Sequence, residues 1–349
     1  MIIIVGAGLS GLLTAYFLQK EGIPFKILEA RNRVGGRINT IYRPDEAPLE
    51  MGATWFTSDH SHLTAILNEL NIAVFEQFTE SKVFYQPNST VPAQVVQIPD
   101  NSGSYRISGG TSNLINTLVQ KLDITDILLN QVVNKVAFNE DFILVKAEKD
   151  FEAMQVVLAL PPKLWANRII FEPELPESLM NVALKTHTWM EDSIKVALTF
   201  SQPFWEEQNI PRTLFSNVGP VTEFYDHCDF KNSKYALCGF INSSFKQFSS
   251  SKRQELVLNQ IKNIFGNQVT EFLHYEECVW SEEKSTFEHS DVALFPHQNN
   301  GHPIFSNSLF GDRLIISSTE SASQFSGYME GAVISAINAA KKIIEAHRK

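Results

Sequence analysis

The chain has 349 residues, 44% of them hydrophobic, and a formal net charge of −10 from 29 Lys and Arg against 39 Asp and Glu. This length can bury the cores of two domains. The acidic balance argues against a nucleic-acid binder, which would carry a basic excess, and no apolar run is long enough to predict a membrane span. The three cysteines lack C-x-x-C spacing, so we expect free thiols in a cytoplasmic protein and neither a disulfide framework nor a metal site.

The N-terminus carries a dinucleotide-binding pattern. An apolar strand is predicted at residues 2–5, directly after Met1, which leaves no room for a signal peptide. A G-x-G-x-x-G turn then opens a helix that ends near Gly22, and a second strand over 24–28 leads to Glu29. Glycines in such a turn let the backbone approach a pyrophosphate at the helix N-terminus, and the acid binds a ribose. The turn comprises Gly6, Ala7, Gly8, Leu9, Ser10 and Gly11.

A second glycine pair follows Glu29. Residues 29–37 read E-A-R-N-R-V-G-G-R, which places Gly35 and Gly36 among several arginines. Arginine forks bind phosphate through paired hydrogen bonds, and a glycine pair permits another close approach of the backbone. We therefore expect this stretch to contact the same dinucleotide. A surface loop with scattered arginines is the alternative interpretation.

The rest of the chain alternates between helical and strand patterns. Residues 86–105, rich in Pro, Asn, Ser and Gly, predict loops with short strands. A helix is predicted from Thr111 or Ser112, either of which could cap it. The apolar run 155–160, stopped by Pro161, predicts a buried parallel strand. Other predicted strands cover 128–133, 142–146 and 313–317, predicted helices cover 252–265 and 327–346, and the block 186–281 is rich in strands.

With these motifs in place, the chain resembles the flavin-containing monoamine oxidase family, which also includes polyamine and amino-acid oxidases. The sharpest resemblance is at residues 318–333, which read S-T-E-S-A-S-Q-F-S-G-Y-M-E-G-A-V. The other matching segments are residues 29–37, 49–54, Gly109–Gly110, 160–162, 193–196, 203–205 and Trp280.

The resemblance implies an α/β fold with a doubly wound, Rossmann-type FAD-binding domain and an inserted α+β substrate domain. We expect residues 1–80, 109–185 and 282–349 to form the FAD-binding domain, and residues 81–108 and 186–281 to form the substrate domain. The stretch that leads from Trp55 to Gly109 is shorter than in larger family members, so the helical lid over the substrate should be shortened.

The resemblance also assigns residues to FAD, which we expect to be bound noncovalently. The glycine turn and Glu29 would hold the ADP half, and Arg31 and Arg37 would serve the pyrophosphate and the approach to the flavin. Met329, at a helix N-terminus, would offer its amide to the flavin C2 carbonyl, where reduced flavin carries negative charge. A strand residue, Val133, would contact the adenine through its main chain. The remaining cofactor residues are Ala30, Gly36, Met51, Gly52, Ala53, Thr54 and Glu320.

Lys195 is the residue that we expect to act in the chemistry. It matches the family lysine that holds a water against flavin N5. Its neighbours Ile194 and Val196 are apolar, and an unpaired charge among them is costly to bury. A lysine on the solvent face of a half-buried strand is the alternative, but Phe204–Trp205 at the family's spacing favours the site.

The resemblance places Tyr328 as one of two rings that face each other before the flavin and steer an amine. Trp280 and Phe287 are expected in the same substrate pocket. The second ring, and the cysteine that attaches flavin covalently in monoamine oxidases, should fall at Ser290 and His289, so neither is retained. Candidates for the missing ring are Phe287 and Phe295.

These matches imply an FAD-dependent amine oxidoreductase. A hydride equivalent would pass from the C–H next to an amine nitrogen to flavin N5, the imine would hydrolyse, and oxygen or another acceptor would reoxidise the flavin. The partners would be a small-molecule amine and that acceptor, with no nucleic acid, membrane or metal. Two alternatives stay open: a flavoenzyme of other chemistry, such as a desaturase or a reduced-nicotinamide oxidase, and a flavin-bound interaction protein whose catalysis has faded.

Overall fold

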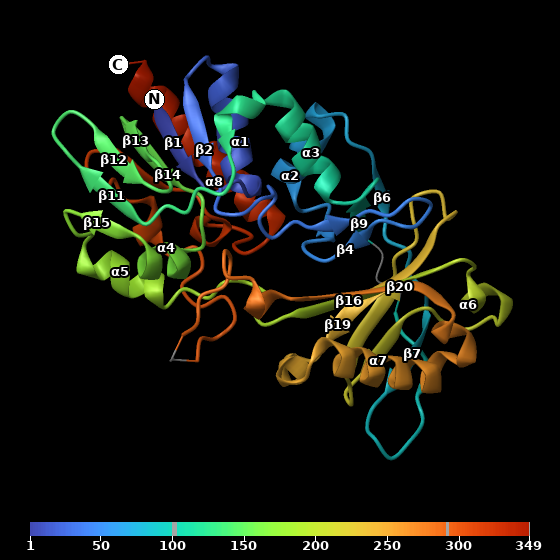
Figure 1. Ribbon diagram of the computed structural model, residues 1–349. Coiled ribbons are helices and arrows are strands. Elements are labelled where there is room, and N and C mark those ends of the chain that lie inside the picture. The colour runs from blue at the N-terminus through green and yellow to red at the C-terminus, as the bar shows by residue number, and fades with distance from the viewer. Residues whose placement is uncertain (100–102, 291–292, 349) are drawn as a thin grey trace.

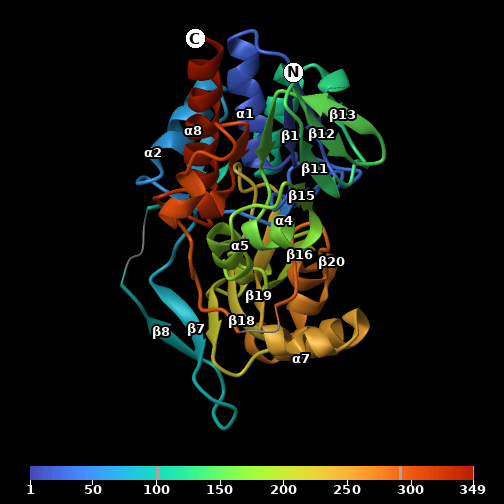
Figure 2. The same cartoon turned by 90° about the vertical axis from the view of Figure 1, so that its left-hand side faces the viewer.

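The computed structural model describes residues 1–99, 103–290 and 293–348. Figure 1 shows two bodies side by side. The first is built around β1 (Ile2–Val5), α1 (Leu9–Lys20) and α8 (Met329–His347), and the second around β16 (Ile194–Phe200) and α7 (Ser250–Phe265). Both ends of the chain lie in the first body, at its end remote from the second (Figures 1 and 2).

A parallel five-stranded sheet forms the centre of the first body. Its strand order is β10-β2-β1-β14-β21, and every neighbouring pair is parallel. The sequence predicted strands at all of these places, so the doubly wound architecture is confirmed at its core. The partners of β1 are β2 (Phe25–Leu28), β10 (Ile127–Leu128), β14 (Gln155–Leu158) and β21 (Leu314–Ile316).

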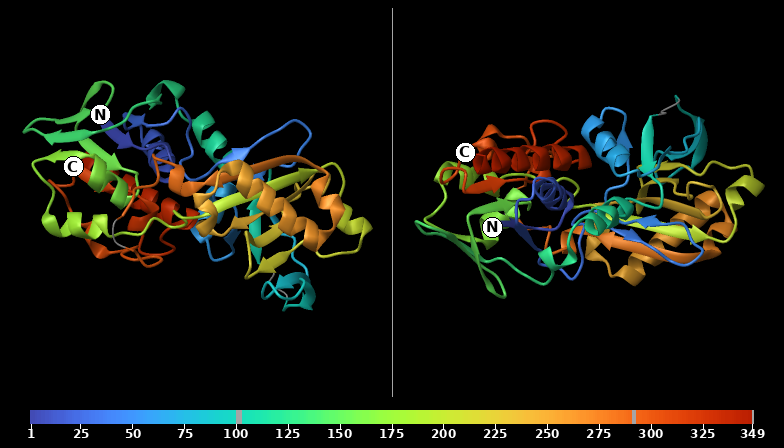
Figure 3. Two further views of the ribbon diagram at one scale, coloured as in Figure 1. Left: turned by 60° about the horizontal axis from the view of Figure 1, so that its bottom comes forward. Right: turned by 90° about the horizontal axis from the view of Figure 1, so that it is seen from above.

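Alternate residues of β1 pack on opposite faces of this sheet. Ile2 and Ile4 face α1, α3 (Ser112–Lys121) and α8, whereas Ile3 and Val5 face a second sheet. All four are at most 3% exposed, and burial on both faces explains why the strand reads as a continuous apolar run. Helices α1 and α8, from opposite ends of the chain, lie side by side (Figure 3).

The second sheet of the first body has the order β13-β12-β11-β15, and only β11 and β15 pair in parallel. Two helices pack into the core between the sheets. The strands are β11 (Lys135–Phe138), β12 (Ile143–Lys146), β13 (Asp150–Ala153) and β15 (Ile170–Glu172), and the helices are α4 (Pro162–Arg168) and α5 (Glu177–Leu184).

A seven-stranded sheet with the order β20-β16-β19-β18-β17-β7-β8 forms the second body. Helix α7 covers its outer face, where Val257 and Ile261 pack against Ile194, Val196 and Leu198. The inner face turns toward the first body, and the β7–β8 hairpin extends away from both (Figure 2). The strands besides β16 are β7 (Lys82–Gln86), β8 (Gln94–Gln97), β17 (Leu214–Ser216), β18 (Val221–Asp226), β19 (Tyr235–Ile241) and β20 (Phe272–Val279).

Short elements complete the described chain. Two small sheets have the orders β3-β4 and β5-β9-β6. Their strands are β3 (Thr40–Ile41), β4 (Leu49–Glu50), β5 (Phe56–Thr57), β6 (Val74–Glu76) and β9 (Ser104–Ile107), and the remaining α-helices are α2 (Ser61–Glu69) and α6 (Phe204–Glu207).

Two local predictions are wrong. Helix α3 begins at Ser112 as expected, but no side chain caps it; instead Glu50 Oε1 accepts a hydrogen bond from Thr111 N at 2.5 Å. The strand predicted over 128–133 ends at Leu128, so Val133 lies in a loop. Asn130 adopts a φ of 57°, which turns the chain out of the extended conformation.

We keep the division into an FAD-binding domain and an inserted substrate domain as a proposal. Sheet membership supports it, because β7 and β8 from the segment 81–108 join the strands of 186–281 in one sheet. Strand β9 of the same segment pairs instead with β5 and β6, at the border between the two bodies.

Glu330 connects α8 to the start of α2 through hydrogen bonds. We predict that Glu330→Ala lowers the free energy of unfolding by about 1.5–3 kcal/mol. The carboxylate is 1% exposed and accepts hydrogen bonds from His62 N at 3.0 Å and Leu63 N at 2.7 Å. Without it, these amides lose their acceptor. Urea unfolding followed by circular dichroism measures the change, with Glu345→Ala as control because its side chain is 60% exposed on the same helix. Equal midpoints for both variants would contradict this role.

Candidate active site

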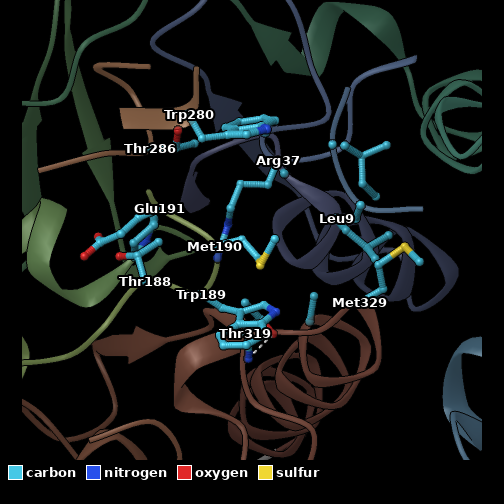
Figure 4. A pocket seen from close by; sticks show the side chains of 18 of the residues that line it. Leu9, Arg37, Thr188, Trp189, Met190, Glu191, Trp280, Thr286, Thr319 and Met329 are labelled. Atoms are coloured by element: carbon cyan, nitrogen blue, oxygen red, sulfur yellow. Dashed lines mark hydrogen bonds between the residues drawn. The ribbon is translucent and has the colours of Figure 1, made fainter. Parts of the chain in front are cut away.

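A cavity of about 840 Å³ lies where the carboxyl ends of β1, β2 and β14 meet the inner face of the seven-stranded sheet. In doubly wound folds, ligands bind outside the carboxyl ends of the parallel strands. Side chains from widely separated segments converge there (Figure 4). Arg37 and Met190 point into its middle, Trp280 lies on one side and Trp189 on the other.

The three glycines of the first turn differ in what requires them. Gly6 has a φ of 105°, and a Cβ there would lie 2.8 Å from Ala159 O, while a Cβ at Gly11 would lie 2.0 Å from Gly6 O. The fold itself requires both. Gly8 has a φ of −74°, which any residue adopts, and the nearest atom to a Cβ there would be Gly36 Cα at 4.0 Å. The protein thus tolerates a side chain at position 8, which would enter the cavity.

Glu29 lies at the end of β2, lines the cavity and is 5% exposed. Its Oε2 accepts a hydrogen bond from Ala7 N at 2.8 Å, and its Oε1 accepts one from Arg31 N at 3.0 Å. An ionised carboxylate has about four acceptor positions, so it can also accept hydroxyl groups from the cavity. Arg31 lines the cavity too, but its guanidinium pairs with Glu283 at 2.6 Å.

Arg37 and Glu320 form an ion pair at the cavity. Arg37 Nη2 lies 2.7 Å from Glu320 Oε1, and the Glu320 side chain has 0% exposure. Within the described residues, no well-aligned hydrogen bond reaches either carboxylate oxygen. Leaving such a buried acceptor unsatisfied is costly. The adjacent Arg37 guanidinium, which lines the cavity, offsets the burial of this carboxylate.

Lys195 projects from the inner face of β16 into the cavity and is 2% exposed. Its Nζ donates to Gly52 O at 2.6 Å and to Thr54 Oγ1, and it lies 4.9 Å from the centre of the Trp55 ring. Burial lowers the pKa of Lys195, and the neighbouring Cys238 and Glu50 oppose this effect. An ammonium has three donors, so one remains to face the cavity.

The segment 51–54 holds this lysine in place. Gly52 passes so close to Arg37 that a Cβ would lie 2.1 Å from Arg37 O. Met51, 1% exposed, accepts a hydrogen bond at its carbonyl from Trp280 Nε1 at 2.8 Å. Trp280 lines the cavity, and so do Gly52, Ala53 and Thr54, whereas Met51 lies behind them.

Tyr328 lines the cavity within a group of stacked rings. Its ring centre lies 5.7 Å from that of Trp189 and 5.9 Å from that of His297, and Trp189 and His297 stack at 4.0 Å. Gly327 permits this packing, because a Cβ there would lie 2.7 Å from Trp189 Cβ.

The expected replacement rings do not occupy this position. Phe295 is 78% exposed and does not line the cavity. Phe287 lines the cavity, but its ring packs against Lys163, whose Nζ lies 5.6 Å from the ring centre. Trp189 is therefore the ring beside Tyr328. Trp189 lies about a hundred residues before Ser290 in the sequence, so the expected positions near Ser290 did not include it.

Helix α8 directs its N-terminus at the cavity. Met329 is its first residue and lines the cavity with Tyr328 and Ala332, and no side chain caps the helix. Thr319 Oγ1 fixes the turn before it by donating to Tyr328 O at 2.6 Å. The first amides of a helix carry partial positive charge, so this end can stabilise a negative charge in the cavity.

Most residues predicted for the site line this one cavity, and four do not. Ala7, Gly11, Met51 and Glu320 do not line it; they support residues that do. The predicted residues that line it are Gly6, Gly8, Leu9, Ser10, Glu29, Ala30, Arg31, Gly36, Arg37, Gly52, Ala53, Thr54, Val133, Lys195, Trp280, Phe287, Tyr328 and Met329.

Several residues that line the cavity were not predicted from the sequence. Leu160 and Pro161 lie two and three residues after the end of β14, so the rule that ligands bind at the carboxyl ends of parallel strands would have found them. Glu191 also lines the cavity and pairs with the buried Lys163 at 2.8 Å. No local pattern predicts this pair. The seven-stranded sheet adds Phe215, Glu223, Tyr225 and Phe240, and the loop before β7 adds Glu80.

No helix of the described residues combines the length and the apolar character that a membrane crossing requires. The same residues contain no group of three or more His, Cys, Asp or Glu side chains arranged to hold a metal ion.

Several known proteins that resemble this chain in sequence or in fold are amine oxidases. The putrescine oxidase of Kocuria rosea is 22% identical over 81% of this chain and 82% of its own length. Flavin-containing amine oxidase B of Homo sapiens is 20% identical over 100% of this chain and 86% of its own. Among solved structures, putrescine oxidase bound to putrescine superposes with a TM-score of 0.84 at 22% identity, covering 99% of this chain and 98% of its own. Cyclohexylamine oxidase from Brevibacterium oxydans superposes with a TM-score of 0.85 at 18% identity, covering 100% and 99%.

The family described as flavin containing amine oxidoreductase matches residues 9–101 and 88–344, which is nearly the whole chain. This match begins within the glycine turn, at Leu9, and covers Lys195 and the start of α8. The chain therefore belongs to the flavin-containing amine oxidoreductases, and it is an enzyme that oxidises amines with FAD.

Proposed function

We propose that the enzyme oxidises a small primary amine at the carbon next to its nitrogen. When bound, FAD supplies the acceptor for a hydride equivalent from that C–H. The amine nitrogen loses a proton, and water hydrolyses the resulting imine to an aldehyde and ammonia. Oxygen or another acceptor then takes the two electrons. We place the enzyme in the cytoplasm, which its three free cysteines support.

The residues of the cavity fit FAD. Gly8 leaves its side-chain volume open toward the cavity, and Glu29 keeps acceptor positions for ribose hydroxyls. Glu320 holds the Arg37 guanidinium at the cavity through an ion pair of 2.7 Å. We propose that the glycine turn and Glu29 hold the ADP half, that the loop containing Val133 contacts the adenine, and that Arg37 with Glu320 serves the pyrophosphate and ribityl groups.

The observation that carries the proposed reaction is the position of the Lys195 ammonium. It is buried between the two bodies, fixed by Gly52 and Thr54, and keeps one donor for the cavity. We propose that this donor holds a water at the reacting edge of the flavin. Rigid strands and two hydrogen bonds define where that water lies, as positioning in catalysis requires.

The side of the cavity opposite Lys195 would stabilise charge on the cofactor and contact the substrate. We propose that the first amides of α8, beginning at Met329, stabilise the negative charge of the reduced cofactor. Tyr328, backed by Trp189, would present the ring against which the amine packs. Trp280 and Phe287 would complete the pocket.

Because position 8 has room for a side chain that would enter the cavity, we predict that Gly8→Val weakens FAD binding while the fold is retained. A valine in the cavity would overpack against the cofactor, at a cost of about 1–3 kcal/mol, which weakens affinity roughly 5- to 150-fold. Flavin fluorescence titration of the apoprotein measures the affinity. Gly11→Ala is the control, and it should lower the melting temperature because its Cβ would meet Gly6 O at 2.0 Å. Undiminished affinity in Gly8→Val would refute this placement of the pyrophosphate.

The absence of the attaching cysteine from the sequence predicts that the flavin is released. Acid precipitation of the purified protein should leave a colourless pellet and a yellow supernatant, since unfolding removes every noncovalent contact. Absorbance of the two fractions measures the outcome. A pellet that stays yellow after washing would show a covalent bond and direct attention to His289.

Lys195→Met should leave FAD content nearly unchanged and slow one chemical step by roughly 10²–10³-fold, as the loss of one preorganised polar contact does. Methionine fills a similar volume, and an apolar replacement of a buried charge is often tolerated. Stopped-flow measurement of flavin reduction by the amine, and separately of reoxidation by oxygen, identifies the step. Lys262→Met, on the outer helix α7, is the matched control. Wild-type rates of both steps in Lys195→Met would mean that this lysine has no catalytic role.

A further inference from the structure

The β7–β8 hairpin carries no charged side chain except Lys82 at its base. Residues 83–99 contain no Asp, Glu, Lys, Arg or His, although 19% of the whole chain is charged. The hairpin joins the seven-stranded sheet through β7, which pairs with β17, and extends away from both bodies (Figure 2). Exposed segments of a protein usually carry charges that keep its copies apart in solution. This hairpin lacks them.

Strand β8 is an open edge of the sheet. It stands last in the strand order, and among the described residues it pairs only with β7. Ile98 N donates to Ser81 O at 2.8 Å, on the side of β7. Along an antiparallel strand, successive residues direct their backbone groups to opposite sides. Val96 therefore bonds to β7, whereas Val95 and Gln97 direct their N–H and C=O groups to the open edge.

This edge lacks the features that usually prevent pairing with another chain. Charges, prolines and bulges protect the edge strands of natural sheets. Strand β8 reads Q-V-V-Q, keeps a regular register with β7, and has Val95 52% exposed. The opposite edge of the same sheet, β20, carries His274, Glu276 and Glu277. Of the two edges, β8 is the one that can accept another strand.

A second copy of β8 satisfies this edge. A row of alternating N–H and C=O groups requires an extended strand as its partner. When a two-fold axis relates two antiparallel strands, one residue must face its own copy, because facing side chains lie on one face of the sheet. Val95 meets this condition. The two copies of Val95 would exchange N–H···O bonds and cover each other's exposed side chains, and Gln97 would pair with Ala93 of the other copy.

Electrostatics also favours the hairpin as the place where two copies meet. Each copy has a net charge of −10, so the bodies repel each other. Pairing through extended hairpins keeps the bodies apart, and at physiological ionic strength charges separated by more than about 8 Å are largely screened. The facing pairs Val95–Val95 and Gln97–Ala93 place no like charges opposite each other.

We propose that β8 is a homodimer interface, in which the antiparallel β8 strands of two copies join their seven-stranded sheets into one continuous sheet. The base of the hairpin lines the cavity through Val83 and Ile98. Pairing of β8 therefore also holds one wall of each cavity in place. The interface is independent of the substrate that the enzyme oxidises.

Sedimentation velocity of the purified holoenzyme, at roughly 1 to 200 µM protein, tests the interface. The wild type should shift from monomer to dimer as the concentration rises. Val95→Pro removes an outward N–H from each copy and leaves the bonds between β8 and β7 in place, because proline is tolerated where the N–H points away from the ladder. This variant should weaken association roughly ten- to a hundredfold, the scale of two lost hydrogen bonds.

Two further variants separate pairing from folding. Val95→Thr keeps the N–H and the branched side chain, and should dimerise within about threefold of the wild type. Val95→Lys places like charges opposite each other, and should dimerise poorly at low salt and better at about 1 M salt. Bound flavin, measured by absorbance, shows that each variant is folded. A wild type that stays monomeric at every concentration, or a dimer that Val95→Pro and Val95→Lys both leave intact, would overturn the interface.

Hydrogen exchange followed by mass spectrometry locates the contact. Peptides that cover 93–98 should exchange more slowly at high protein concentration than at low concentration, whereas peptides from the other edge strand, β20, should exchange equally at both. Slower exchange at β20, with no change at 93–98, would place the dimer contact elsewhere and refute the pairing of β8.

Discussion

The site depends on one constraint, the parallel pairing of strands that lie far apart in the sequence. In a parallel sheet the carboxyl ends share one edge, so β1, β2, β14 and β21 deliver the glycine turn, Glu29, Leu160 and Ser318 to one place. The start of α1, which follows β1, contacts the residue after β21, since Ser10 Oγ lies 2.7 Å from Ser317 Oγ. Helix α8 follows from this edge, which explains how the two ends of the chain form one cofactor site.

The two bodies contribute different chemistry to the cavity. The parallel sheet presents backbone amides and a carboxylate suited to phosphate and ribose, whereas the seven-stranded sheet presents single side chains at fixed positions in its rows. Burying the Lys195 ammonium is unfavourable, and it is offset by Gly52 O, Thr54 and the ring of Trp55. These contacts come from the first body and the lysine from the second, so the site is complete only when both are in contact.

The elements that were predicted correctly from the sequence are those that local residue patterns determine. Strand β1, the glycine turn and helix α1 follow from a single stretch of residues, and the family resemblance located Lys195 and the start of α8. The predictions that were wrong concern positions whose conformation is determined by contacts with residues far away in the sequence. A left-handed Asn130 ended the strand before Val133, and Glu50 replaced the expected cap of α3. Trp189 and Glu223 could not be predicted as residues that line the cavity. The position of Trp189 depends on its packing against Gly327, and that of Glu223 on a β-bulge in β18 opposite β19. Neither feature has a local signal in the sequence.

We propose that the cavity between these bodies is an FAD site in which amines are oxidised. Anaerobic mixing of the purified yellow protein with a panel of amines tests it most directly, with reduced nicotinamide in a parallel experiment. We expect flavin absorbance to be lost at a rate that saturates with amine concentration, and an aldehyde and ammonia to form. Absorbance that is unchanged by every amine but lost with reduced nicotinamide would contradict it.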